Sequence, residues 1–148
     1  MKKTILLILM GFVALAGFAQ SKEDRDAKAK EFMEFKIKFL ADEMELKGDV
    51  RQKFVALYTQ YETEKRVLWK NAKELEKKIK NNKNATETDY DEWQKAKAKI
   101  DDLDSAYNKK FAQFLNSKQM YKLKTAEEAF MRKMRDCRDK KKGEKKKK

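Results

Sequence analysis

The sequence of 148 residues contains no histidine, no proline, a single cysteine and only four glycines. Without histidine the chain lacks the commonest general base and the imidazole ligand on which many transition-metal sites depend. It also has no glycine-rich phosphate loop, and its paired carboxylates, such as Asp101 and Asp102, lie among lysines on what reads as a solvated helix face. We therefore expect neither an enzyme nor a metal or cofactor site.

The single cysteine excludes a disulfide within the chain. Cys137 follows Phe130 and Met134 at helical spacing, so we expect it to be buried as a small hydrophobic residue. The alternative is a disulfide between two copies of the chain. Charged residues make up 43% of the sequence, and no stretch alternates apolar and polar residues between turn signals. These features predict an all-α fold held together by helix packing.

The N-terminus has the features of a secretory signal peptide. Lys2 and Lys3 precede an apolar run at residues 5–16, and residues 17–19 (Gly-Phe-Ala) fit the small-x-small cleavage pattern. We expect residues 1–19 to be removed before Gln20 and the chain to be exported to the periplasm. The alternative is an uncleaved N-terminal anchor.

Apolar residues recur at helical spacing through the rest of the chain and predict four helices. Their expected ranges are 22–45, 50–80, about 89–114 and 117–138. Residues 20–138 would then form one domain, and the lysine-rich residues 139–148 would be a disordered basic tail.

The first helix has two apolar stripes, which indicates two packing partners. One stripe contains Ala29, Met33, Ile37, Leu40 and Met44, and the other contains Phe32, Phe35 and Phe39. One of the two is expected to face the core. The other would complete the core, form a dimer seam or contact a partner.

The turn before the fourth helix has a capping sequence. With Asn116 as N-cap, its side chain can accept a hydrogen bond from the backbone of Gln119, and the Gln119 side chain can accept one from the backbone N–H of Asn116. Leu115 and Met120 then occupy the positions of a hydrophobic staple. The sequence predicts a compact corner between the third and fourth helices.

Leu115, Asn116 and Gln119 resemble the Leu-Thr-x-x-Gln signature of the Spy/CpxP-like periplasmic family, with Asn in place of Thr. The stretches FKIKFLADEMEL and KQMYKLKTAEEAFMRKM resemble the branch described as sensors of ECF-type sigma factors, and the resemblance extends over residues 25–138. It implies an elongated, curved, hairpin-like fold of four helices, commonly a homodimer. Members act as ATP-independent chaperones, as stress-pathway regulators or as metal sensors.

The equivalent turn before the second helix departs from this signature. Leu46 keeps the Leu position, but Lys47 and Val50 stand where Thr and Gln are expected. Because a lysine side chain cannot accept a capping hydrogen bond, we expect a shifted start with Asp49 as N-cap and Gln52 at N3.

A chaperone that binds unfolded or misfolded proteins fits this composition best. Without residues 1–19 the net charge is +11, which is +13 less Lys2 and Lys3. This surface would attract acidic segments of a client, and interleaved aromatic residues would add weak apolar contacts. The expected client-binding residues are Phe32, Phe35, Lys36, Lys38, Phe39, Tyr58 and Trp69. The alternative is that these residues complete the core or a dimer seam.

The second functional hypothesis is a regulatory protein of envelope stress that docks on a membrane-bound sensor or anti-sigma partner through its basic helices. Export argues against a nucleic-acid partner. The basic tail would contact anionic lipid headgroups weakly or would only increase solubility.

Overall fold

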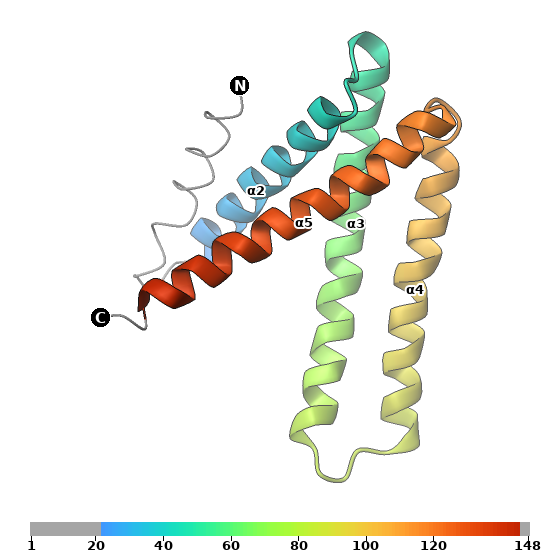
Figure 1. Ribbon diagram of the computed structural model, residues 1–148. Helices are drawn as coiled ribbons and strands as arrows, with labels where there is room; N and C mark the ends of the chain where they lie inside the picture. The colour runs from blue at the N-terminus through green and yellow to red at the C-terminus, as the bar shows by residue number, and fades with distance from the viewer. Residues whose placement is uncertain (1–21, 146–148) are drawn as a thin grey trace. The chain divides into compact units, whose positions relative to one another are not determined.

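The computed structural model describes residues 22–145, so the predicted signal peptide lies outside the described residues. The described part forms four helices and no strand: α2 (Lys22–Glu43), α3 (Gly48–Asn81), α4 (Glu87–Phe111) and α5 (Ser117–Lys145) (Figure 1). The all-α, four-helix prediction is confirmed. None of these helices is long and apolar enough to cross a membrane.

The chain divides into two units within α2, Met1–Phe32 and Met33–Lys148. In the first unit the described residues are the N-terminal half of α2, and Phe32 at its end is 38% exposed. The second unit contains the end of α2 and the other three helices, and the main hydrophobic core lies there.

Helices α3 and α4 run side by side as a hairpin (Figure 1). In the half nearer their connecting loop, Ala72, Ala96 and Ile100 are buried between the two helices, with Leu68 and Leu75 packed around them. The two alanines let the helix backbones come close together, so this half of the hairpin has a thin apolar seam.

The other half of the hairpin packs against α2 and α5 around an aromatic core. The largest fully buried side chains are Tyr58 and Phe54 of α3, Tyr107 and Phe111 of α4, and Phe130 of α5. Ring centroids lie 5.7 Å apart for Phe54 and Phe111 and 5.1 Å apart for Tyr61 and Tyr107. Tilted and edge-on ring pairs at such distances add to the stabilisation from burial.

From Met33 onward both stripes of α2 are packed within the second unit, as the prediction of two partners requires. Ile37, Leu40 and Phe39 are buried. The rings of Phe35 and Phe39 lie 6.0 Å and 5.5 Å from Phe130, so the phenylalanine stripe faces α5.

The end of α2 differs from the expected end at residue 45. The helix ends at Glu43, and Glu45 takes a left-handed conformation with φ 57°. The Leu46 N–H donates to the Ala41 carbonyl and the Glu45 N–H donates to the Asp42 carbonyl, both at 3.0 Å. This pair of bonds is a Schellman motif, in which a residue other than glycine occupies the left-handed position.

The predicted start of α3 with Asp49 as N-cap and Gln52 at N3 is wrong. The N-cap is Lys47, whose side chain makes no capping hydrogen bond, and Asp49 lies inside the first turn. The turn is held instead by Arg51, whose guanidinium group donates to the Leu46 carbonyl at 3.3 Å and pairs with Asp42 at 2.8 Å. Asp49 still contributes by placing a negative charge at the helix N-terminus.

The start of α5 agrees with the prediction. The Gln119 N–H donates to Asn116 Oδ1 at 2.9 Å, and the Asn116 N–H donates to Gln119 Oε1 at 3.0 Å. Leu115 is buried and Met120 packs against the main core, where a hydrophobic staple would place them.

The end of α5 corrects the predicted tail. Residues 139–148 were expected to be disordered, but the helix continues through residues 139–145, and residues 146–148 lie outside the described residues. Lysine is a good helix former, so a lysine-rich segment can continue a helix. Charge repulsion along the tail is therefore not sufficient to end the helix at Arg138.

Candidate functional site

The core contains several of the residues expected to bind clients. Tyr58 is 0% exposed and Phe39 is 5% exposed, so neither side chain is accessible to a partner in the folded protein. Phe35 is half-buried beside Phe130. For these three residues the alternative interpretation, that they complete the core, is correct. The cause is the two-sided packing of α2, which leaves no free aromatic stripe.

The remaining predicted residues are more accessible, and they belong to two different helices. Lys38 is exposed on α2, and Trp69 on α3 is 50% exposed. Lys36 is half-buried, because its ammonium group lies 2.5 Å from the Glu62 carboxylate and 5.4 Å from the centroid of the Tyr58 ring. Only Phe32, Lys38 and Trp69 of the predicted set thus remain exposed.

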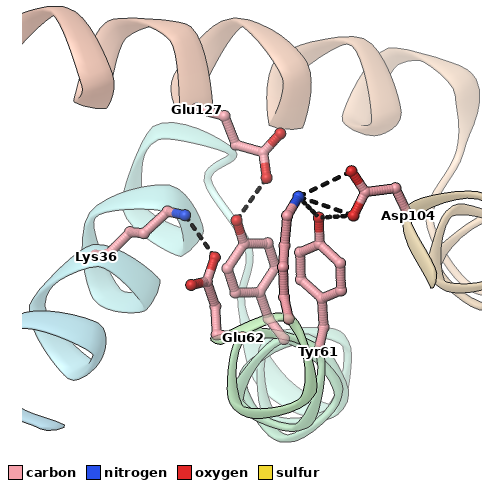
Figure 2. A network of polar contacts seen from close by, with 7 residues as sticks. Lys36, Tyr61, Glu62, Asp104 and Glu127 are labelled. Carbon is pink, nitrogen blue, oxygen red and sulfur yellow. Dashed lines mark hydrogen bonds and ion pairs between the residues drawn. The ribbon is translucent and has the colours of Figure 1, made fainter. Parts of the chain in front are cut away.

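A polar network surrounds the buried tyrosines where the helices meet (Figure 2). The Tyr58 hydroxyl donates to Glu127 of α5 at 2.5 Å, and Lys36 of α2 donates to Glu62 of α3. Figure 2 shows Lys36 and Glu127 reaching toward α3 from separate helices. These bonds join α2, α3 and α5 through side chains that would be costly to leave unpaired.

The same network extends to α4. The Tyr61 hydroxyl donates to Asp104 at 2.8 Å, and Lys65 pairs with Asp104 at 2.8 Å (Figure 2). Tyr107 of α4 donates in the opposite direction, to Glu64 of α3 at 2.7 Å. Among the residues that the structure describes, no buried side-chain nitrogen or oxygen lacks a partner.

The tyrosines of this network act as neutral hydrogen-bond donors. Burial, with nearby carboxylates, raises the pKa of Tyr58 and of Tyr61 far above the usual value. Burial and the bond to Glu64 raise the pKa of Tyr107 to about 12. In the neutral form each hydroxyl donates its hydrogen bond to a carboxylate on another helix, and these bonds hold the helices together.

A different cluster lies on the outside of the α3–α4 hairpin. The Lys97 ammonium group is 5.5 Å from the ring centroid of Trp69 and 5.9 Å from that of Trp93, so one lysine of α4 lies beside both indole rings. Arg66 and Lys73 stand three residues before and four residues after Trp69, on the same side of α3. We call Arg66, Trp69, Lys73, Trp93 and Lys97 the tryptophan patch.

The charges around this patch interact with one another. The hydrogen bond from Lys80 is the main cause of the lowered pKa of Glu76, and the charges of Lys97 and Lys73 lower it further. Glu76 is already paired with Lys80 at 2.6 Å. The charges of Lys73 and Lys97 therefore act on a carboxylate of the same hairpin that Lys80 already pairs with.

Sequence reasoning identified Trp69 but not Trp93 or Lys97 as part of this surface. Trp93 is half-buried. The missing information was the register between α3 and α4, which brings residues 69 and 93 to the same lysine. Further large apolar side chains are exposed on α5, at Tyr121 and Met131.

Within the described part of the chain, no group of three or more Cys, Asp or Glu side chains could hold a metal ion. The fold and these surfaces define an all-helical protein with a polar junction inside and a basic, aromatic exterior. Comparison of the chain with protein-family models, with curated proteins and with solved structures finds no match.

Proposed function

We propose that the protein is an exported holdase chaperone that binds unfolded protein segments without nucleotide. The observation that carries the proposal is the set of large apolar side chains left exposed on a lysine-rich surface. Trp69, Tyr121 and Met131 are each at least half exposed. They belong to a chain with 38 basic and 25 acidic residues.

The physical basis is a combination of long-range and short-range attraction. An excess of positive charge draws acidic segments toward the surface, with no requirement for a particular sequence. Exposed aromatic and methionine side chains then make adaptable apolar contacts that tolerate many partners. Because each contact is weak, a client can leave to fold without an energy source. The resemblance to the Spy/CpxP-like family supports the same function and the periplasm as its compartment.

The experiment is suppression of aggregation. A chemically unfolded, aggregation-prone protein is diluted into buffer with increasing amounts of the purified chain, without ATP, and light scattering is followed. We expect suppression near a stoichiometric ratio. Raising the salt from about 0.1 M to about 1 M should weaken it, because the screening length falls from about 10 Å to about 3 Å.

The absence of suppression at any ratio would contradict the holdase proposal. It would favour the regulatory alternative, in which the basic surface docks on an acidic domain of an envelope signalling protein. Mass spectrometry of the purified chain would show in the same preparation whether it begins at Gln20. Size-exclusion chromatography with light scattering would test the homodimer.

A further inference from the structure

The middle of the α3–α4 hairpin carries charge of one sign only. Residues 66–73 of α3 and residues 93–99 of α4 contain no acid, and these two segments include both tryptophans of the chain. Their charged residues are Arg66, Lys70, Lys73, Lys95, Lys97 and Lys99. Toward the loop, acids return at Glu74 and Glu76 on one helix and at Glu92 on the other. The two cationic segments thus form a band of positive charge that ends, toward the loop, where these acids begin.

The two segments lie next to each other in the fold. Ala72 of one segment and Ala96 of the other are buried in the same cluster. Lys97 lies beside Trp69 across the hairpin. The tryptophan patch is therefore a single surface assembled from two stretches of sequence.

The patch continues a helix face that is covered elsewhere in the core. Trp69 follows Glu62 by seven residues and Tyr58 by eleven, so the three share one side of α3. Glu62 and Tyr58 on this side contact Lys36 of α2 and Glu127 of α5. Trp69 instead remains 50% exposed.

We propose, as a deepening of the holdase function above, that the tryptophan patch binds extended acidic polypeptide segments that also carry apolar side chains. Charge complementarity selects the partner, since Lys97 lies beside both indoles and Lys73 follows Trp69 by one helical turn. A carboxylate of the segment pairs with Lys97 and draws the ammonium group away from the rings. The uncovered indole faces then accept a neighbouring phenylalanine or leucine side chain.

The arrangement of the cations favours a polypeptide over a nucleic-acid strand. Lys95 and Lys99 stand two residues on either side of Lys97, about 200° around the helix, and so point away from the patch. Lys97 beside the two rings and Lys73 one turn from Trp69 remain on the patch side, which suits a short segment with spaced carboxylates. A single-stranded nucleic acid requires a longer continuous track of positive charge.

The test uses the intrinsic fluorescence of the chain, because its only two tryptophans both belong to the patch. The probe is a short synthetic peptide, free of tryptophan, in which glutamates alternate with phenylalanine and leucine. We expect the peptide to shift the emission and to protect the indoles from acrylamide quenching, with weaker binding at high salt. A matched peptide with lysine in place of glutamate should have no effect.

Two double variants distinguish an effect of charges within the tryptophan patch from an effect of the net charge of the chain. Lys73→Gln with Lys97→Gln should weaken peptide binding by about five-fold, since two exposed charge pairs are lost. Lys95→Gln with Lys99→Gln removes the same charge from the opposite side of α4 and should change binding by less than about two-fold. Equal losses in the two double variants would overturn the proposal, because net charge alone would explain them.

The outcomes also separate the patch from the holdase function. If the chain suppressed aggregation but did not respond to the acidic peptide, the proposed role of the tryptophan patch would be overturned and the holdase function would stand. Peptide binding without suppression would support the patch as a docking site and contradict the holdase. A fluorescence response to single-stranded DNA but not to the peptide would replace the proposed partner with nucleic acid.

Discussion

The hydroxyl of the buried Tyr58 donates a 2.5 Å hydrogen bond to Glu127, a residue 69 positions further along the chain. The bond joins the core side of α3 to α5. Tyr58 also packs against Phe54 and Phe111, with ring centroids 5.2 Å and 5.8 Å away. One residue thus contributes to both the aromatic core and the polar junction.

Tyr58→Phe should remove the hydrogen bond and keep the packing. We expect the free energy of unfolding to fall by about 1–2 kcal/mol, because the Glu127 carboxylate loses its donor. Tyr58→Ala should cost more, about 3–5 kcal/mol, because a cavity is added. Urea denaturation followed by circular dichroism would measure both. The Glu127→Gln variant completes a double-mutant cycle, and strictly additive effects of the two changes would argue against the bond.

As the pH is raised, the fold should lose stability at a lower pH than ionisation of the exposed groups alone predicts. Burial raises the pKa of Tyr58 and Tyr61 in the folded state, and that of Tyr107 to about 12. Each neutral tyrosine contributes fully to the free energy of unfolding below its pKa in the unfolded chain, which is about 10. This contribution is lost as the pH rises toward and through the higher pKa that the tyrosine has in the folded state.

The melting temperature should therefore fall steeply from about pH 10 to about pH 12. Absorbance at 295 nm should show the three tyrosines ionising together with loss of helical signal. Tyr107→Phe serves as the control, since it removes one of the coupled groups and should make the fall shallower. An unchanged slope in this variant would show that Tyr107 is not involved.

Glu45→Gly should relieve backbone strain at the end of α2. Glu45 has φ 57°, a conformation that disfavours side chains with a Cβ atom. The same residue pairs with Lys122 of α5, and that hydrogen bond is the main cause of its lowered pKa. In high salt, where the ion pair is screened, we expect the glycine variant to melt at a higher temperature than the original chain.

Glu45→Gln is the matched control, because it removes the charge and keeps the strained backbone. It should melt slightly below the original chain at low salt and equal to it at high salt. If the glycine and glutamine variants melted together in high salt, the left-handed conformation would carry no measurable cost.

Phe39→Ser and Phe32→Ser should behave differently, although both residues belong to the same predicted stripe. Phe39 is buried beside Phe130, so its replacement should cost about 3–5 kcal/mol of unfolding free energy. Phe32 is partly exposed, and its replacement should cost less than about 1 kcal/mol. Thermal melts of the two variants would test this, and equal losses would contradict the assignment of Phe39 to the core.

The local features of the sequence predicted much of this fold. The capping turn at Asn116 and Gln119 could be predicted because its two hydrogen bonds join residues three apart. The helices could be predicted because apolar residues recur along each of them. The turn after α2 could not, since Glu45 is unusual in a left-handed position and Arg51 holds the turn through Leu46 and Asp42.

The candidate surface depended on contacts that no single helix specifies. Whether Phe39 faces solvent is decided by how many helices pack on α2, and Phe130 lies far along the chain. Tyr58 was expected to bind clients, but α5 supplies Glu127 and makes that side of α3 an interior. Likewise, Trp69 and Trp93 meet at Lys97 only because of the register of the α3–α4 hairpin.

The sequence by itself determined the helices, the cap of α5 and the excess of positive charge, because these follow from residues near one another or from composition. The tertiary structure decided which aromatic side chains are buried and which cations gather around the tryptophans. Burial and clustering depend on the packing of helices distant in sequence, and their register is set by the whole core and not by local spacing.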